Sequence, residues 1–290
     1  MNAIFKRELR SYFHGMMGYV LTAFLMADTG LYFLALNLGY GLTDYNYYTL
    51  YRTIFVLLIY FPVLTMRSLA EERHSRTDQL LLTSPVSVSG VVLGKYFAMC
   101  AVFAIPCLLD AVMILLLWGL GGTVSTLIAN LAGLLCYFLM GCAAIAIGEF
   151  LSGLTDNQII AAVMGFAALL LAYLMPSLRS MFNTGSAVAL AVFTGLAGAA
   201  SLAAGFRTRS FTLGCLSFAA SCVALCALFL LKSAWLTDAF STVLSALCLF
   251  TPFEEFVNSS FSIPVLVYYL SVSAVFLFLT MQGIEKRRWN

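Results

Sequence analysis

The sequence predicts an all-α, polytopic integral membrane protein, a bundle of about eight transmembrane helices preceded by an amphipathic interfacial helix. Of its 290 residues 62% are hydrophobic and 10% are charged, and the mean hydropathy is +0.97. A soluble domain is about 25% charged, and uncharged apolar runs of about 18 or more residues are typical of membrane-spanning helices. The runs in this chain are continuously apolar, which excludes the alternating strands of a membrane β-barrel.

The N-terminal stretch, residues 1–16, has the pattern of an amphipathic helix. Its sequence MNAIFKRELRSYFHGM places Phe5, Leu9, Tyr12 and Met16 along one helical face, and its charged residues lie largely elsewhere. Such a helix is suited to the interface between membrane and water. Residues 17–290 then form the transmembrane domain, beginning with a run too long for a cleaved signal peptide.

Apolar runs define the spans, and basic residues define their orientation. We expect spans at 17–38, 51–66, 96–118, 127–150, 159–175, 187–206, 211–231 and 264–282. Basic residues concentrate on the cytoplasmic side of a membrane protein. With the N-terminus inside, only Arg52, Arg179 and Lys232 lie outside. Both termini are therefore expected in the cytoplasm, together with the remaining basic residues: Lys6, Arg7, Arg10, Arg67, Arg73, Arg76, Lys95, Arg207, Arg209, Lys286, Arg287 and Arg288.

The loop at residues 66–95 separates the second and third spans. Its segment Glu71–Gln79 (EERHSRTDQ) is polar on every side, so no face of it suits lipid. The chain then breaks at Pro85 and restarts as a helix through Ser87 and Ser89. Two interpretations stay open for its charged residues. They form a solvated loop with local pairs such as Glu72–Arg76, or they dock a partner protein.

Two carboxylates lie inside expected spans, Asp28 in the first and Asp110 in the third. A carboxylate at the bilayer centre costs about 2.5–3.5 kcal/mol on insertion scales, so each should face protein or water. They could line a transport pathway or bind a proton, or they could be neutral, hydrogen-bonded packing residues. Glu149, at the end of the fourth span, is expected at the membrane interface beside Asp156.

The sequence lacks the residue patterns that several kinds of catalytic or binding site require. The phosphate-binding pattern G-x-x-x-x-G-K-[ST] is missing, so ATP hydrolysis by this chain is not expected. The chain has two histidines, His14 and His74, and its eight cysteines form no C-x-x-C pair. We therefore expect no metal site, no catalytic residues and no cofactor in this chain. No basic, aromatic-interleaved patch suggests nucleic-acid binding.

The last third of the chain has features of its own. The apolar runs 187–206 and 211–231 flank the basic RTR motif, Arg207–Arg209, and we expect them to form a helix pair. Small residues recur every four positions from Ala187 to Ala203, which is typical of closely packed helices in membranes. Residues 235–263 are expected to form an amphipathic helix or loop on the outer face.

The polar loop also carries a family resemblance. EERHSRTDQLLLTSPVSVSGVVLGKY resembles the cytoplasmic loop of ABC transporter type 2 permeases, whose pattern is roughly E-x-x-x-G-T-x-x-L-L-x-[ST]-x-P. Arg76 stands where that pattern usually has glycine. The residues that fall close to the pattern are Glu72, Thr77, Leu80, Leu81, Thr83 and Pro85.

Within that family, the chain is most similar to the gliding-motility and nitrous-oxide-maturation branch. The similarity lies in the basic opening IFKRELRSYF, in GEFLSGLTDNQIIAA at 148–162, and in the C-terminal VYYLSVSAVFLFLTMQGIEKRRW at 267–289. Relatives in this branch typically have six spans, so the pair at 187–231 resembles an insertion.

The resemblance implies a permease subunit of an ATP-driven exporter in a bacterial inner membrane, surrounded by membrane lipid. It would pair with a second permease half, identical or homologous, and with separate cytoplasmic ATPase subunits that bind ATP and Mg²⁺. The 66–95 loop would be the coupling helix that docks on the ATPase, with a second cytoplasmic loop beside it. The implied docking residues are Glu71, Glu72, Arg73, Arg76, Thr77, Asp78, Leu80 and Leu81, with Thr155, Asp156 and Asn157 in the second loop.

The alternative function is an ion- or proton-coupled secondary transporter that uses Asp28 and Asp110. Such transporters usually contain inverted repeats and broken helices, and the sequence shows no convincing internal repeat. The transported substrate and the choice between homodimer and heterodimer stay open.

Overall fold

A computed structural model of the chain describes residues 2–75, 77, 87–181, 190, 194–195, 198, 201, 238, 242, 244–258 and 260–288. All regular elements in these ranges are helical. The chain divides into two compact units, one formed by Met1–Leu171 with Leu249–Asn290 and the other by Ala172–Cys248. The elements are α1 (Asn2–His14), α2 (Met17–Tyr32), η1 (Phe33–Leu38), η2 (Asn46–Leu50), α3 (Tyr51–Thr65), α4 (Ala70–His74), α6 (Val88–Gly119), α7 (Val124–Ser152), α8 (Gln158–Met181), α12 (Phe253–Val257) and α13 (Ile263–Arg288).

The expected all-α, polytopic architecture is confirmed. In the described part of the chain, six helical segments are long and apolar enough to cross a membrane: Met17–Leu38, Asn46–His74, Val88–Gly119, Val124–Ser152, Gln158–Ser177 and Ile263–Lys286. They correspond to six of the expected spans. The expected pair at 187–231 and most of 235–263 lie outside the described residues, so the count of eight stays a prediction. Met17–Leu38 has the expected bounds, and the other five run longer because helix formation continues beyond the apolar stretches.

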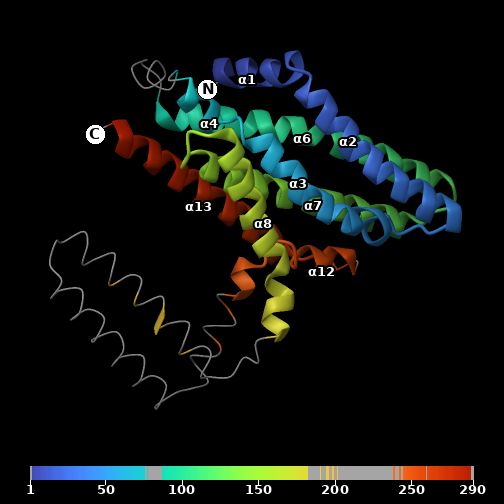
Figure 1. Cartoon of the computed structure of the whole chain (residues 1–290). Coiled ribbons are helices and arrows are strands. Elements are labelled where there is room, and N and C mark those ends of the chain that lie inside the picture. The colour runs from blue at the N-terminus through green and yellow to red at the C-terminus, as the bar shows by residue number, and fades with distance from the viewer. Residues whose placement is uncertain are drawn as a thin grey trace. The chain divides into compact units, whose positions relative to one another are not determined.

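The first unit has a polar end that contains both termini. Figure 1 shows α1, α4 and the last turns of α13 at this end, which we call the terminal end. The π-helical segments η1 and η2 lie at the other end, where α2 turns back into α3. Successive spanning helices of this unit therefore run in alternating directions.

Helix α7 lies at the centre of the first unit, packed against α13, α6, α3 and α12. Glycines on α7 allow this close packing, because a side-chain carbon at each would overlap a neighbour. Gly141 faces the ring of Phe103 on α6, and Gly148 faces the side chain of Thr65 on α3. Small residues at such positions are the usual means by which membrane helices approach one another.

At the end opposite the termini, buried hydrogen bonds hold the η1–η2 connection against the bundle. The backbone N–H of Tyr45 donates to Asn130 Oδ1 at 3.1 Å, and its hydroxyl donates to Asp110 Oδ1 at 2.9 Å. Thr49 Oγ1 donates to Asn37 Oδ1 at 2.8 Å. Polar groups in a membrane must find partners inside the protein, and these bonds provide them.

Helix α1 packs on α6, and the residues that it buries in the protein are mostly not those of its apolar face. Ile4 and Tyr12 are buried, whereas Met16 is 72% exposed. Tyr12 donates a hydrogen bond from its hydroxyl to the carbonyl oxygen of Leu64 at 3.0 Å. The apolar face Phe5–Leu9–Tyr12–Met16 therefore shares only Tyr12 with the buried residues of α1, and its position in the membrane interface stays a prediction. The polar partners that α3, α4 and α6 offer to α1 select a face that apolarity alone does not mark.

The packing around α7 predicts a contrast between two glycine substitutions. Gly141→Val should destabilise the protein by about 1–3 kcal/mol, because the added atoms displace the ring of Phe103. Gly283→Ala on α13 is the control, since its added carbon meets nothing within 4 Å and alanine favours the helix. Thermal unfolding in detergent measures both. Equal midpoints for the two variants would contradict the central position of α7.

Candidate functional site

The short polar helix α4 is positioned by the end of α7. No side chain of its own caps its N-terminus. Instead the hydroxyl oxygen of Ser152, the last residue of α7, accepts hydrogen bonds from the N–H groups of Leu69 at 3.2 Å and Ala70 at 3.1 Å. Ser152 is fully buried. The first N–H groups of a helix need such acceptors, so α7 determines where α4 begins.

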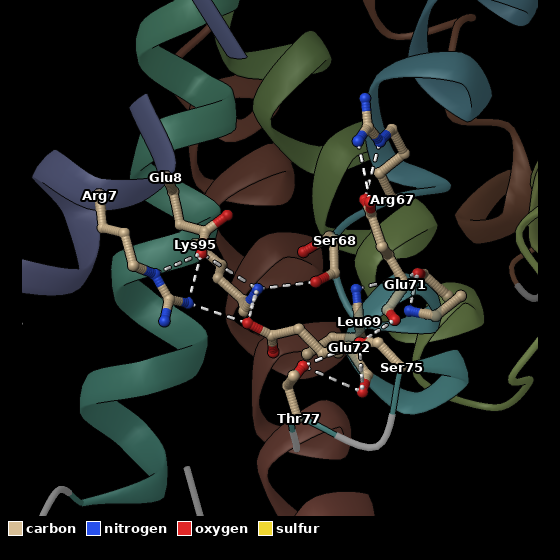
Figure 2. Close-up of polar contacts among 12 residues, drawn as sticks. Arg7, Glu8, Arg67, Ser68, Leu69, Glu71, Glu72, Ser75, Thr77 and Lys95 are labelled. Atoms are coloured by element: carbon tan, nitrogen blue, oxygen red, sulfur yellow. Dashed lines mark hydrogen bonds and ion pairs between the residues drawn. The ribbon is translucent and has the colours of Figure 1, made fainter. Parts of the chain in front are cut away.

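A buried lysine joins α4 to two other helices, as Figure 2 shows. Lys95 on α6 is 2% exposed. Its ammonium group donates to the carbonyl oxygen of Ser68 at 2.7 Å and lies 3.0 Å from Glu72 Oε1 on α4. It also lies 3.4 Å from Glu8 Oε1 on α1. One cation thus contacts α1, α4 and the segment that leads into α4.

Arg7 adds a second cation to the same carboxylates. Its Nη2 lies 2.6 Å from Glu8 Oε1 and 2.9 Å from Glu72 Oε1. Partial burial acts to lower the pKa of Arg7, but hydrogen bonds and charge from Glu8 and Glu72 raise it above its usual value. We call Arg7, Glu8, Glu72 and Lys95 the ion-pair cluster. Its two cations balance its two carboxylates, so Glu72 is committed to contacts within the chain.

Glu71, the neighbour of Glu72, has a different environment. Its carboxylate forms a two-point ion pair with Arg67, one turn earlier, at 2.8 Å and 2.9 Å. The two side chains are 38% and 42% exposed. Exposed pairs of this kind typically contribute about 0.3–0.5 kcal/mol. Glu71 is therefore accessible to a partner in a way that Glu72 is not.

The second predicted loop lies against α4. Arg73 of α4 is 7% exposed, and its Nη1 is 4.0 Å from Oδ1 of the exposed Asp156. The side chain of Asn157 caps α8, accepting from the N–H of Ile159 at 2.9 Å. Thr155 Oγ1 accepts from the N–H of Asn157 at 3.2 Å. The structure thus brings the two predicted docking segments together.

The other predicted loop residues divide into two groups. Thr77 is exposed and its hydroxyl donates to the carbonyl oxygen of Glu72 at 3.3 Å. Arg76, Asp78, Leu80 and Leu81 lie outside the described residues.

Glu149, which was expected at the membrane interface, is not exposed at the protein surface. It is fully buried near the end of α7. Neither carboxylate oxygen has a hydrogen-bond partner among the described residues. The hydropathy pattern places Glu149 near the end of a span, but helices that pack over this end of α7 bury it.

Sequence reasoning also missed the roles of Arg7, Glu8, Lys95 and Ser152. Residue patterns do not reveal their contacts, because Arg7 and Glu72 are 65 positions apart and Ser68 and Lys95 are 27 apart. The one sequence feature that could have indicated these contacts is the lysine at the start of a strongly apolar helix, because a buried cation needs a partner.

Asp28 and Asp110 are placed in different surroundings. Asp110 is fully buried, and its Oδ1 is occupied by the hydroxyl of Tyr45. Asp28 is partly exposed, and its Oδ2 has no hydrogen-bond partner among the described residues. No hydrogen bond joins the two carboxyl groups in the described part of the chain. In the same part, no group of three or more His, Cys, Asp or Glu residues could hold a metal ion.

These features define a class of protein: a multi-pass helical membrane protein with a small polar helix bonded to its spanning helices at one end. Residues 26–193 match the family described as "ABC-2 family transporter protein". Because this match covers more than half of the chain, the chain belongs to that family. It is an ABC transporter permease, a membrane subunit for transport. A comparison with curated proteins finds no match.

The ion-pair cluster predicts that two neighbouring glutamates differ in importance. Glu72→Gln removes a charged partner from the buried Lys95 and should cost about 1–3 kcal/mol of stability. Glu71→Gln is the matched control, with an expected loss below about 0.5 kcal/mol. Denaturant or thermal unfolding of the purified chain distinguishes them. A larger loss in Glu71→Gln would show that the cluster does not hold α4.

Proposed function

We propose that this chain is the permease subunit of an ATP-binding cassette exporter whose separate ATPase docks on α4 and the loop between α7 and α8. The observation that supports this most directly is that α4, which is polar and too short to span, is bonded to α1, α6 and α7. A helix held in this way is suited to transmit force from a soluble partner to the bundle.

Each bond to α4 offers a route for that force. A displacement of α4 would act on α7 through the hydroxyl of Ser152, on α6 through Lys95, and on α1 through Arg7 and Glu8. Buried, hydrogen-bonded ion pairs resist separation, because an unpaired buried charge costs several kcal/mol. In this proposal the ATPase therefore moves three helices together.

The proposed docking surface consists of exposed residues at the terminal end. Glu71, His74, Thr77, Asp156 and Asn157 are at least partly exposed there. Glu72 and Arg73 are assigned a different role, since their contacts lie within the chain. They would orient α4 rather than touch the ATPase.

The wider assembly follows from the same proposal. The terminal end would face the cytoplasm of a bacterial cell, as the expected charge distribution favours. A second permease half would complete the pathway, and the ATPase subunits would bind ATP and Mg²⁺. Placement in the gliding-motility and nitrous-oxide-maturation branch is part of this proposal, and rests on the sequence resemblance.

The docking surface predicts selective loss of the ATPase. The variant Glu71→Lys should reduce ATPase co-purification and transport together, because like charges brought together at an interface cost several kcal/mol. Its thermal stability should stay near wild type, since Glu71 and its ion-pair partner Arg67 are both partly exposed. Glu285→Lys on α13 is a control for an exposed charge change outside the surface. ATPase recovery, normalised to permease level, is the measurement. Wild-type recovery with Glu71→Lys would contradict the docking proposal.

A second experiment separates this function from proton-coupled transport. Asp28→Asn and Asp110→Asn should leave ATP-driven transport largely intact, because asparagine at 110 keeps an acceptor for Tyr45. A proton-coupled carrier would lose transport in these variants and show an altered pH dependence. Transport measured across pH in both variants decides between the two mechanisms. Severe loss in both, at normal protein levels, would favour the secondary transporter.

A further inference from the structure

The buried carboxyl group of Glu149 has no role in the contacts described so far. It lies one turn before Ser152 on α7 and is fully buried. Neither oxygen has a hydrogen-bond donor among the described residues. Burying an ionised carboxylate without donors costs several kcal/mol. This arrangement therefore accommodates the protonated, neutral form.

Among the described residues, Lys95 on α6 is the cation linked most directly to this part of α7. Its ammonium group donates to the carbonyl oxygen of Ser68, and the next two N–H groups, of Leu69 and Ala70, donate to Ser152, one turn after Glu149. Over such short separations the positive charge of Lys95 attracts an ionised Glu149, whereas the carboxylate of Glu8 repels it. In the present arrangement the ammonium of Lys95 is occupied by Ser68, Glu72 and Glu8.

Other polar groups near Glu149 are engaged elsewhere. The hydroxyl of Tyr12 on α1 donates to the carbonyl oxygen of Leu64, and the hydroxyl of Thr65 on α3 donates within its own helix. Cys100 on α6 is buried. Among the described side chains of α4, α13 and the segment before α4, Arg67 and Glu71 pair with each other, Arg73 has the contact given above, and Glu285 and Lys286 are exposed.

We propose that Glu149 is a proton-binding site whose occupancy decides which carboxylate Lys95 pairs with. With the proton bound, Lys95 stays with Glu8 and Glu72, and the ion-pair cluster is neutral overall. When the proton leaves to water, Glu149 adds an uncompensated negative charge beside Lys95. The flexible lysine side chain then turns toward Glu149, and Glu8 and Glu72 keep only Arg7 as a shared cation.

This exchange would loosen α4. Lys95 is the buried link among α1, α4 and α6, so its departure from Glu72 weakens the hold of α6 on α4. If α4 carries the ATPase, as proposed above, proton loss at Glu149 would change the position of the docking helix. That consequence rests on the proposed function, whereas the proton site and the exchange of partners do not.

The proton site is tested by infrared spectroscopy on the purified chain in lipid nanodiscs, without any ATPase. As the pH is raised, wild type should lose a band of a buried protonated carboxyl group. That band should be missing in Glu149→Gln and unchanged in Glu71→Gln. The absence of any such difference between wild type and Glu149→Gln would overturn the proposal. Glu149→Leu gives a second comparison should the glutamine variant fold poorly.

The exchange of partners is tested by hydrogen–deuterium exchange, corrected for intrinsic rates at each pH. In wild type, peptides from α1 and α4 should exchange faster over the pH range in which the infrared band disappears. Glu149→Gln should show no such rise, and Lys95→Met should exchange fast at every pH. If the infrared band titrates but peptides from α1 and α4 exchange hydrogen at the same rate across that pH range, the proposed change of partner by Lys95 is overturned. Because no ATPase is present, these outcomes are independent of whether the docking proposal holds.

Discussion

The ammonium group of Lys95 is the interaction on which the terminal end of this protein depends. It is almost fully buried and lies where α1, α4 and α6 meet. A buried cation without partners is strongly destabilising, so Glu8, Glu72 and the carbonyl oxygen of Ser68 are needed for this end to form. The same requirement draws the N-terminal helix onto the bundle, although its apolar residues alone would suit the lipid interface.

The opposite end satisfies the same physical demand mainly with uncharged side chains. There Asn37, Tyr45, Thr49 and Asn130 exchange hydrogen bonds with one another and with the backbone, and Asp110 takes part through Tyr45. The two ends have different consequences. Neutral bonds between rigid helices hold a connection in place, whereas charged groups that share one lysine can exchange partners when a proton is gained or lost.

Glu71 and Glu72 illustrate how position on a helix separates two adjacent residues of one type. Successive side chains differ by about 100° around a helix axis. One glutamate therefore reaches Lys95 and Arg7 inside the protein, and the other pairs with Arg67 near the surface. If the whole acidic segment were treated as surface, Glu71 and Glu72 would be given the same role. The fold separates them, because Glu72 holds α4 in place and Glu71 is available to a partner.

The sequence by itself determined the class of protein, most of its spans and its family. Hydropathy and helix length are local properties, and a span must satisfy its backbone within itself. The apolar runs therefore correspond to six described helices. The motif in the polar loop is also local, and the family match agrees with it. Only the tertiary structure decided that Lys95 and Glu72 meet, that Glu149 is buried, and that Asp110 accepts from Tyr45. These facts depend on contacts between distant segments, because the burial and pairing of a charge are set by the helices that pack around it.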